Sequence, residues 1–282
     1  MNIIKKRKIF YGISLIIIIV GLIMMGTRGL NYGIDFVGGT SLQIKIGKAL
    51  TVEQAREIMD KFDKEASIIH VGNARDEIII KSNKDFSNNE IDDIVNEFVD
   101  EFDIEQKEFQ SEKFESTMGD EIKRKALISS LIAAFGMLIY ITWRFRLNFA
   151  VAAIIALLHD ILIMLSVYAI FGIPANSAFI AAILTILGYS INDTIVIFDR
   201  IREESRINSK RSIEDIINHS IKKSLARTIN TSLTTLIAVV VLYIIGVEAV
   251  KVLALPLIFG IIAGTYSSLF IASPIWWRLE GR

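Results

Sequence analysis

The chain has 282 residues, and 52% of them are hydrophobic, a larger apolar share than the core of a soluble protein requires. It carries no net formal charge and no cysteine, which excludes disulfides, thiolate metal sites, thiol nucleophiles and lipoprotein anchors. Between residues 27 and 125, 22 Asp and Glu residues stand against 14 Lys and Arg. We therefore predict a polytopic membrane protein that carries an acidic insert.

Six apolar stretches are long enough to cross a bilayer, whose hydrocarbon core is about 30 Å thick. The first stretch is interpreted as a retained anchor, because it is longer than a usual signal core and no Ala-x-Ala cleavage site follows it. The predicted spans are Ile9–Gly26, Ala126–Trp143, Leu147–Phe171, Ser177–Phe198, Ile229–Gly246 and Val252–Ile275.

The orientation of the spans follows from the basic residues near their ends, which are enriched on the cytoplasmic side. Six crossings put four basic groups on one side, and both termini are therefore predicted to be cytoplasmic, together with a loop over residues 199–226. Residues 123–125 are also basic and would lie outside. They follow a large translocated domain, beside which the preference of basic residues for the cytoplasmic side is weaker. The four groups lie at residues 5–8, 144–146, 200–223 and 278.

A polar segment of ordinary domain size, residues 29–122, separates a first part (1–28) from a five-helix part (123–282). Its strands and helices alternate as β-α-β-β-α-β, the order of ferredoxin-like α+β domains. We interpret it as an extracytoplasmic docking or binding domain without catalytic residues. Its elements are "SLQIKI", the helix Val52–Glu65, "SIIHV", a turn with Gly72 and Asn73, "EIIIKS", the helix Asn88–Phe102 and "IEQKEFQ".

The fourth span contains an ionisable residue, Asp193, well inside the apolar stretch. A carboxylate at that depth costs at least about 2.5 kcal/mol, so we expect it to face protein or water and to be functional. Asn192 and Asp193 continue a polar stripe at helical spacing, and we expect that stripe to face other helices. The other positions of the stripe are Thr185, Gly188 and Tyr189.

A partner for this acid is expected in "LARTINTSLTT", where Arg227 follows the basic loop by about one helical turn. Its long side chain reaches further into the membrane, and Thr231, Thr234 and Thr235 continue its face with hydroxyls that can bridge to the acid or hold water. One interpretation is an ion-coupling pair. The alternative is a fixed ion pair that only sets helix register.

The third span carries a second polar pair, His159 and Asp160, near its middle. Histidine titrates near neutrality and can relay protons, and an adjacent carboxylate can orient its ring. An interhelical hydrogen bond is an equally good interpretation of His159. Neighbouring residues on a helix point about 100° apart, so the two side chains need not share one surface.

Protease chemistry is not supported by these acids. An intramembrane aspartyl protease would use two carboxylates that share a proton, but the Gly-x-Gly-Asp signature is absent before Asp193. No Gly-x-Ser-x-Gly occurs either. The sequence indicates a non-enzyme with no resident cofactor, no metal site and no nucleic-acid partner.

The stretch "GIDFVGGT", Gly33–Thr40, follows the first span directly. It fits neither Gly-x-Gly-x-x-Gly nor the phosphate-binding loop of nucleotide hydrolases. We interpret it as a glycine turn that feeds a strand, with Gly38 and Gly39 free to take positive φ.

Taken in order, "GIDFVGGT", "LHD", "GYSINDTIVIFDRIRE" and "ARTINTSLTT" closely resemble the SecD/SecF protein-export family of the RND superfamily. The resemblance covers nearly the whole chain and matches its smaller subunit in unfused form. It implies a bacterial inner-membrane protein that pairs with SecD, associates with SecYEG and YajC, and helps draw a translocating preprotein outward with the proton motive force.

The resemblance also implies roles for individual residues. Asp193 and Arg227, with Asn192 and Thr231, would line a pathway for H⁺ or Na⁺ at the SecD interface. His159 and Asp160 would extend that pathway, and the glycine motif would serve as a hinge. The remaining alternative is an RND-type exporter half that moves a lipid or small molecule. The motif positions carried over are Gly33, Asp35, Phe36, Gly38, Gly39 and Thr40.

Overall fold

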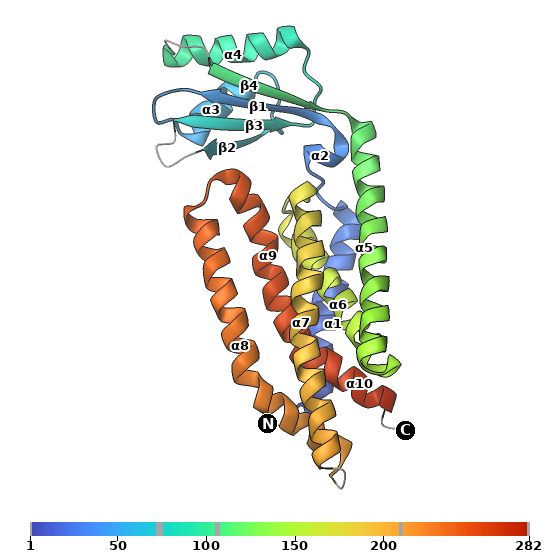
Figure 1. Ribbon diagram of the computed structural model, residues 1–282. Helices are drawn as coiled ribbons and strands as arrows, with labels where there is room; N and C mark the ends of the chain where they lie inside the picture. The colour runs from blue at the N-terminus through green and yellow to red at the C-terminus, as the bar shows by residue number, and fades with distance from the viewer. Residues whose placement is uncertain (1, 72–75, 105–107, 209–210, 281–282) are drawn as a thin grey trace. The chain divides into compact units, whose positions relative to one another are not determined.

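The structure is a computed structural model, and it describes residues 2–71, 76–104, 108–208 and 211–280. The chain divides into two units (Figure 1). The membrane unit comprises Met1–Asn31, Leu127–Ile244 and Val252–Arg282, and the α/β unit comprises Tyr32–Ala126 with Ile245–Lys251.

Six helices of the described chain are long and apolar enough to cross a membrane, which confirms the predicted polytopic class. The last of these spans is built from three consecutive pieces, the middle one a π-helical turn. The helices are α1 (Ile3–Arg28), α5 (Ser116–Arg144), α6 (Leu147–Phe171), α7 (Ser177–Ile207), α8 (Ile213–Ile245), α9 (Glu248–Ser267), η1 (Ser268–Ala272) and α10 (Ser273–Glu280).

The helix ends differ from the predicted span ends wherever polar residues continue the helix. The third predicted span coincides with α6, which ends where Gly172 takes a left-handed φ of 65°. By contrast α7 continues past Phe198 to Ile207, and α8 starts at Ile213. Most of the predicted loop at 199–226 is therefore helical.

Small residues let the helices of the membrane unit approach closely. A Cβ added to Gly21 of α1 would lie 2.2 Å from the Cβ of Ser166 on α6. A Cβ on Gly264 of α9 would lie 2.9 Å from the Cβ of Ser190 on α7. These contacts bring α1 against α6, and α9 against α7, at the level where the buried polar residues lie.

The α/β unit contains a four-stranded antiparallel sheet in the order β2-β3-β1-β4. The predicted order of strands and helices is the order observed, preceded by a short helix that the sequence pattern did not reveal. The elements are α2 (Ile34–Val37), β1 (Gly39–Lys45), α3 (Val52–Met59), β2 (Ser67–Val71), β3 (Glu77–Ser82), α4 (Asn88–Phe102) and β4 (Glu108–Phe114).

Alternating side chains of the sheet form one core with α3 and α4. Leu42, Ile44, Ile78 and Ile80 point into it, and Phe98 of α4 is completely buried there. Both helices begin with a capping box, a hydroxyl side chain that accepts from the backbone while a Gln or Glu bonds back. The helices therefore start where the sequence predicts.

Two predicted boundaries in this unit are wrong. The helix predicted to reach Glu65 ends at Met59, because the next amides bond within a tight turn. The last strand runs on to Phe114 rather than ending at residue 110, because its register with β1 continues to the pair Gly39 and Phe114, while residues 105–107 of the prediction lie outside the described residues. The predicted turn with Gly72 and Asn73 lies outside the described residues.

Candidate ion-coupling site in the membrane unit

Asp193 lies on the buried side of α7, where 4% of its surface is exposed. The Ser232 hydroxyl of α8 donates to Asp193 Oδ2 over 3.2 Å. Thr265 Oγ1 of α9 donates to Ser232 Oγ over 2.7 Å. The carboxylate is thus held among three helices, as expected for an ionisable residue within a span.

Arg227 lies on the exposed side of α8. Among the residues that the structure describes, no ion pair within 4.0 Å joins it to Asp193. The two side chains belong to facing helices, but Ser232, rather than the guanidinium, occupies the position next to the acid. In the conformation described here Ser232 therefore bonds the carboxylate, and the role of Arg227 as its partner stays a prediction.

The polar stripe of α7 is only partly covered by the helices of this chain. Asp193 is buried, but Thr185, Gly188 and Asn192 are exposed. Because each residue turns the helix by about 100°, these three lie on a flank beside the buried face. These three positions are exposed in the described chain, so for them the expectation that the stripe faces other helices stays a prediction.

The structure does not place the hydroxyl of Thr231 at the acid. Thr231 is exposed, and its hydroxyl donates to the carbonyl oxygen of Arg227 over 2.9 Å. Threonine in a helix commonly satisfies its hydroxyl in this way, four residues back along the same helix. The adjacent Ser232 lies on the buried face and makes the bond to the acid instead.

His159 and Asp160 are both buried near the middle of α6, and they do share one surface. His159 Nδ1 lies 3.0 Å from Asp160 Oδ1, and His159 Nε2 lies 2.8 Å from the hydroxyl of Ser14 on α1. The ring of Tyr266 on α9 stacks on the imidazole with 6.0 Å between centroids. Both ring nitrogens therefore have partners.

Two serines complete the surroundings of Asp160. Ser190 Oγ of α7 donates to Asp160 Oδ2 over 2.6 Å, and Ser267 Oγ of α9 lies 2.9 Å from the same oxygen. The sequence analysis missed both, as well as Ser14 and Ser232. A serine in an apolar helix equally suits close packing, although Ser190 stands one helical turn before Asp193 and so offered a signal.

The two acids are connected through α9. Thr265 of α9 reaches the Asp193 cluster through Ser232, and Ser267 reaches Asp160 directly. Ser268, where the π-helical turn begins, lies 2.8 Å from the hydroxyl of Thr194 and 3.2 Å from the carbonyl oxygen of Ser190. Turns of π-helix inside α-helices occur frequently at functional sites.

The glycine motif lies in the α/β unit and contains no ionisable cluster. Gly38 and Gly39 have φ of 84° and 139°, so the prediction of positive φ is confirmed. A Cβ on Gly39 would lie 2.1 Å from the carbonyl oxygen of Ser82. Thr40 is buried, and its hydroxyl bonds the carbonyl of Lys84 and the amide of Phe86.

The other motif positions hold α2 in place. Gly33 precedes α2 in extended conformation, and Asp35 lies in its first turn. Phe36 is buried, and a Cβ on Gly119 of α5 would lie 2.1 Å from the Phe36 carbonyl oxygen. The backbones of α2 and α5 are therefore in direct contact, so the motif fixes where α5 begins.

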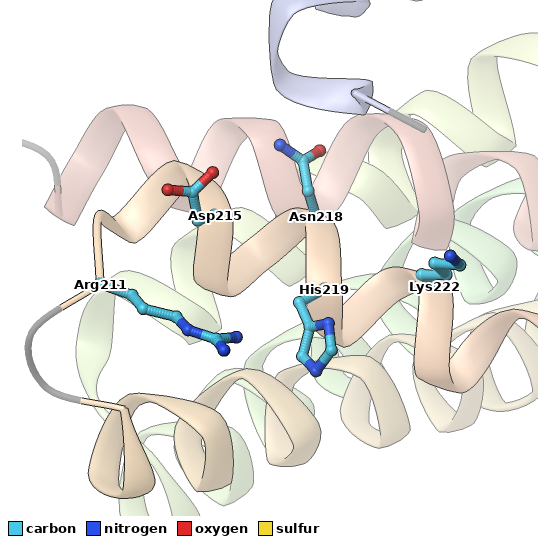
Figure 2. A pocket seen from close by; sticks show the side chains of 5 residues that line it. All are labelled: Arg211, Asp215, Asn218, His219 and Lys222. Carbon is cyan, nitrogen blue, oxygen red and sulfur yellow. The ribbon is translucent and has the colours of Figure 1, made fainter.

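A separate hollow of about 370 Å³ lies at the start of α8 (Figure 2). Asn218 in its wall accepts from the backbone amide of Ile3 over 2.8 Å and thereby caps α1. Asn218 thus takes part in a structural contact between α8 and α1. Its lining consists of Arg211, Asp215, Asn218, His219 and Lys222. No group of three or more His, Cys, Asp and Glu among the described residues is arranged to hold a metal ion.

The family model described as protein export membrane protein SecD/SecF, C-terminal, matches residues 94–282, and the SecD/SecF GG motif matches residues 23–49. The protein translocase subunit SecF of Desulfurispirillum indicum is 39% identical over 97% of this chain and 90% of that protein. Its counterpart in Calditerrivibrio nitroreducens is 40% identical over 98% of this chain and 92% of that protein.

Among solved structures, SecDF from Thermus thermophilus, described as a translocon-associated membrane protein, is similar to this chain with a TM-score of 0.85 and 31% identity. The match covers all of this chain but 39% of that longer one.

Proposed function

This chain belongs to the SecD/SecF family of protein export membrane proteins, and on that premise we propose that it is the smaller subunit of a SecD/SecF complex. The complex assists SecYEG-dependent translocation of preproteins across the bacterial inner membrane, with YajC as an associate, and uses the proton motive force. The names of its relatives, all translocase subunits, support this transport role over an enzymatic one.

In this proposal both termini are cytoplasmic, and the α/β unit is an extracytoplasmic domain of ferredoxin-like fold. The sheet order and the two helices on one face support that fold. The same orientation follows from the basic residues near the span ends. The unit would meet the preprotein or SecD outside the membrane.

The observation that carries the coupling proposal is the position of Asp193, buried in a span beside an uncovered polar flank. Exposed polar and charged groups are costly against lipid and favourable against another protein. We assign this flank to SecD. Its exposed members are Thr185, Gly188 and Asn192 on α7 and Arg227, Thr231 and Thr234 on α8.

Asp193 acts as a switch between two charge states. When it is ionised it attracts Arg227, and when a proton from outside neutralises it that attraction is lost, so that α7 and α8 change their packing. Moving one charge through 100 mV supplies about 2.3 kcal/mol, which shifts a two-state population roughly 50-fold. Na⁺ is the alternative driving ion, since a carboxylate with nearby hydroxyls can bind either. His159 and Asp160 form a further step of the pathway.

The test is Asp193→Asn in the chain reconstituted with its SecD partner and SecYEG. The variant keeps size and insertion but cannot titrate, so proton flux and potential-dependent export should both fall to the level without the complex. Asp199→Asn, at the exposed end of α7, is the matched control and should retain both. Wild-type flux and export in Asp193→Asn would refute the switch.

Exchanging the two charges, with Asp193→Arg and Arg227→Asp, separates a carrier from a fixed ion pair. A pair that only sets helix register should recover function when its charges are exchanged. A proton carrier should not, because the acid no longer occupies the buried position. Copurification with SecD would support the assigned partner, whereas copurification of a bound amphiphile would favour an exporter of lipids or small molecules.

A further inference from the structure

The start of α1 and the end of α10 bring cations together at one end of the membrane unit, where both ends of the chain lie (Figure 1). The guanidinium carbon of Arg7 on α1 lies 4.5 Å from the ring centroid of Trp277 on α10. One nitrogen of the same guanidinium donates to the carbonyl oxygen of Ile4 over 2.7 Å. A guanidinium has five N–H donors, so Arg7 is held in place and still has donors for another ligand.

A second guanidinium and a phenol belong to the same group. Arg278 follows Trp277 directly and is exposed. Tyr11 stands about one turn after Arg7 on α1 and is close enough to both arginines to interact with their charges. Its hydroxyl can also donate a hydrogen bond. Two cations, an indole and a hydroxyl from the first and last helices therefore converge on one place.

The described residues supply no anion to this group. Neither Arg7 nor Arg278 has an ion pair within 4.0 Å in the described chain. Helix α1 contains no Asp or Glu, and the one acid of α10, Glu280, bonds Arg146 and Asn148 of α6 instead. Because like charges that converge without a counter-charge repel each other, an anionic ligand is favoured here.

The position of the group in the membrane indicates the kind of anion. Arg7 stands two residues before the predicted start of the first span at Ile9, and Arg278 three residues after the predicted end of the last span at Ile275. At about 1.5 Å per residue, both lie within about 5 Å of the hydrocarbon. That depth is the headgroup layer, where tryptophan is enriched and where phospholipids carry their phosphate.

We propose that Arg7, Arg278 and Tyr11 bind the phosphate of an anionic phospholipid, with Trp277 as the residue that positions Arg7. A guanidinium can donate to two phosphate oxygens at once, which suits the held side chain of Arg7. The ammonium group of a zwitterionic lipid is repelled by the same cations, so a lipid of net negative charge is preferred. The bound lipid bridges the first and last helices. This inference goes beyond the proposed function and does not depend on it.

The experiment measures contact between lipid and Trp277 in the full chain, in nanodiscs that contain phosphatidylglycerol and phosphatidylcholine. One of the two lipids is brominated just below the headgroup, so that it quenches tryptophan fluorescence on contact. The chain has three tryptophans, and Trp143→Phe removes the one that is 84% exposed, while Trp276 is buried. Trp277 should prefer phosphatidylglycerol about 25-fold, about fivefold for each of two arginines.

Three variants separate a built site from general surface charge. Arg278→Gln alters an exposed side chain and should lower the preference about fivefold. Arg7→Lys keeps the charge but loses the planar fork, and should also lower it about fivefold. Lys8→Gln is the matched control, because it removes an exposed charge from the same end of α1 and should change the preference by less than about twofold.

Two results would overturn the site itself. Equal quenching by the two lipids would show that no anionic lipid is bound. A preference that is unchanged in Arg7→Lys, or that falls as far in Lys8→Gln as in Arg278→Gln, would show diffuse attraction to a basic surface.

Inorganic phosphate distinguishes a lipid from a soluble ligand with the same chemistry. At constant ionic strength, millimolar phosphate should leave the preference for phosphatidylglycerol unchanged, which supports a lipid held at headgroup depth. Loss of the preference on addition of phosphate would assign the site to a soluble phosphate and overturn the lipid.

Discussion

In the α/β unit Thr40 and Ser82 are buried polar side chains near chain turns, whereas in the membrane unit Asp160 and Asp193 are buried well inside helices. Thr40 and Ser82 stand at strand ends and bond backbone groups of the loop at residues 84–86. Asp160 and Asp193 are instead bonded by side chains from other helices. The first arrangement satisfies backbone hydrogen-bonding groups and therefore contributes to the stability of the unit. The second joins different helices to one another through side chains.

The largest effect is expected from the backbone of the glycine motif. Gly39→Ala puts a Cβ against the Ser82 carbonyl at a φ of 139°, so the α/β unit should lose at least about 3 kcal/mol of stability. Its thermal transition should fall by about 15 °C in calorimetry of the full chain. Gly47→Ala is the control, with positive φ but open space, and should cost about 1 kcal/mol. Equal losses in both variants would contradict the packing explanation.

A pair of single-hydroxyl deletions compares the two units directly. Thr40→Val leaves the buried amide of Phe86 without its acceptor, and should cost about 2 kcal/mol and about 10 °C in the transition of the α/β unit. Ser190→Ala should cost only about 0.6 kcal/mol, a typical interhelical hydrogen bond. Thr40→Val should therefore lower the thermal transition of its unit more than Ser190→Ala lowers that of the membrane unit. The reverse pattern would remove the distinction between the units.

The smallest effect concerns the start of α4. The backbone amide of Ser87, and next its hydroxyl, hold the pKa of Glu90 below its ordinary value. A lowered folded-state pKa means that this stabilisation is present above the unfolded pKa and is lost as pH falls through the folded one. Wild type should therefore be more stable than Glu90→Gln at neutral pH, and the difference should shrink below about pH 4. A difference that does not change with pH would show that the charge is irrelevant to the cap.

The helices, strands and spans were predicted from the sequence far better than the side-chain contacts between them. The helix Asn88–Phe102 was predictable because its apolar residues recur at helical spacing behind a capping box at Ser87 and Glu90. The span Leu147–Phe171 was predictable because it is bounded by Arg146 and Gly172. Hydropathy reports the apolar region rather than the helix end, so α7 was predicted to end at Phe198.

The candidate site was predictable only in its ionisable members. Asp193, His159 and Asp160 stand out because a charge within a span is rare. Their hydroxyl partners do not, since one step of about 100° around α8 separates Ser232 on the buried face from exposed Thr231. Which of two adjacent hydroxyls meets the acid depends on how the helices pack, and a single sequence does not contain that information.

The π-helical turn at Ser268–Ala272 changes the direction in which the side chains after it point within the last span. Before it, Ser267 bonds the carboxylate of Asp160; after it, Trp276 stacks on Phe149 of α6, with ring centroids 4.4 Å apart. If the same five residues were wound as regular α-helix, each would turn the helix further, and everything downstream would be rotated relative to its present orientation. Trp276 would then lose its contact with Phe149. The π-helical turn therefore lets one span place Ser267 at Asp160 and Trp276 against Phe149.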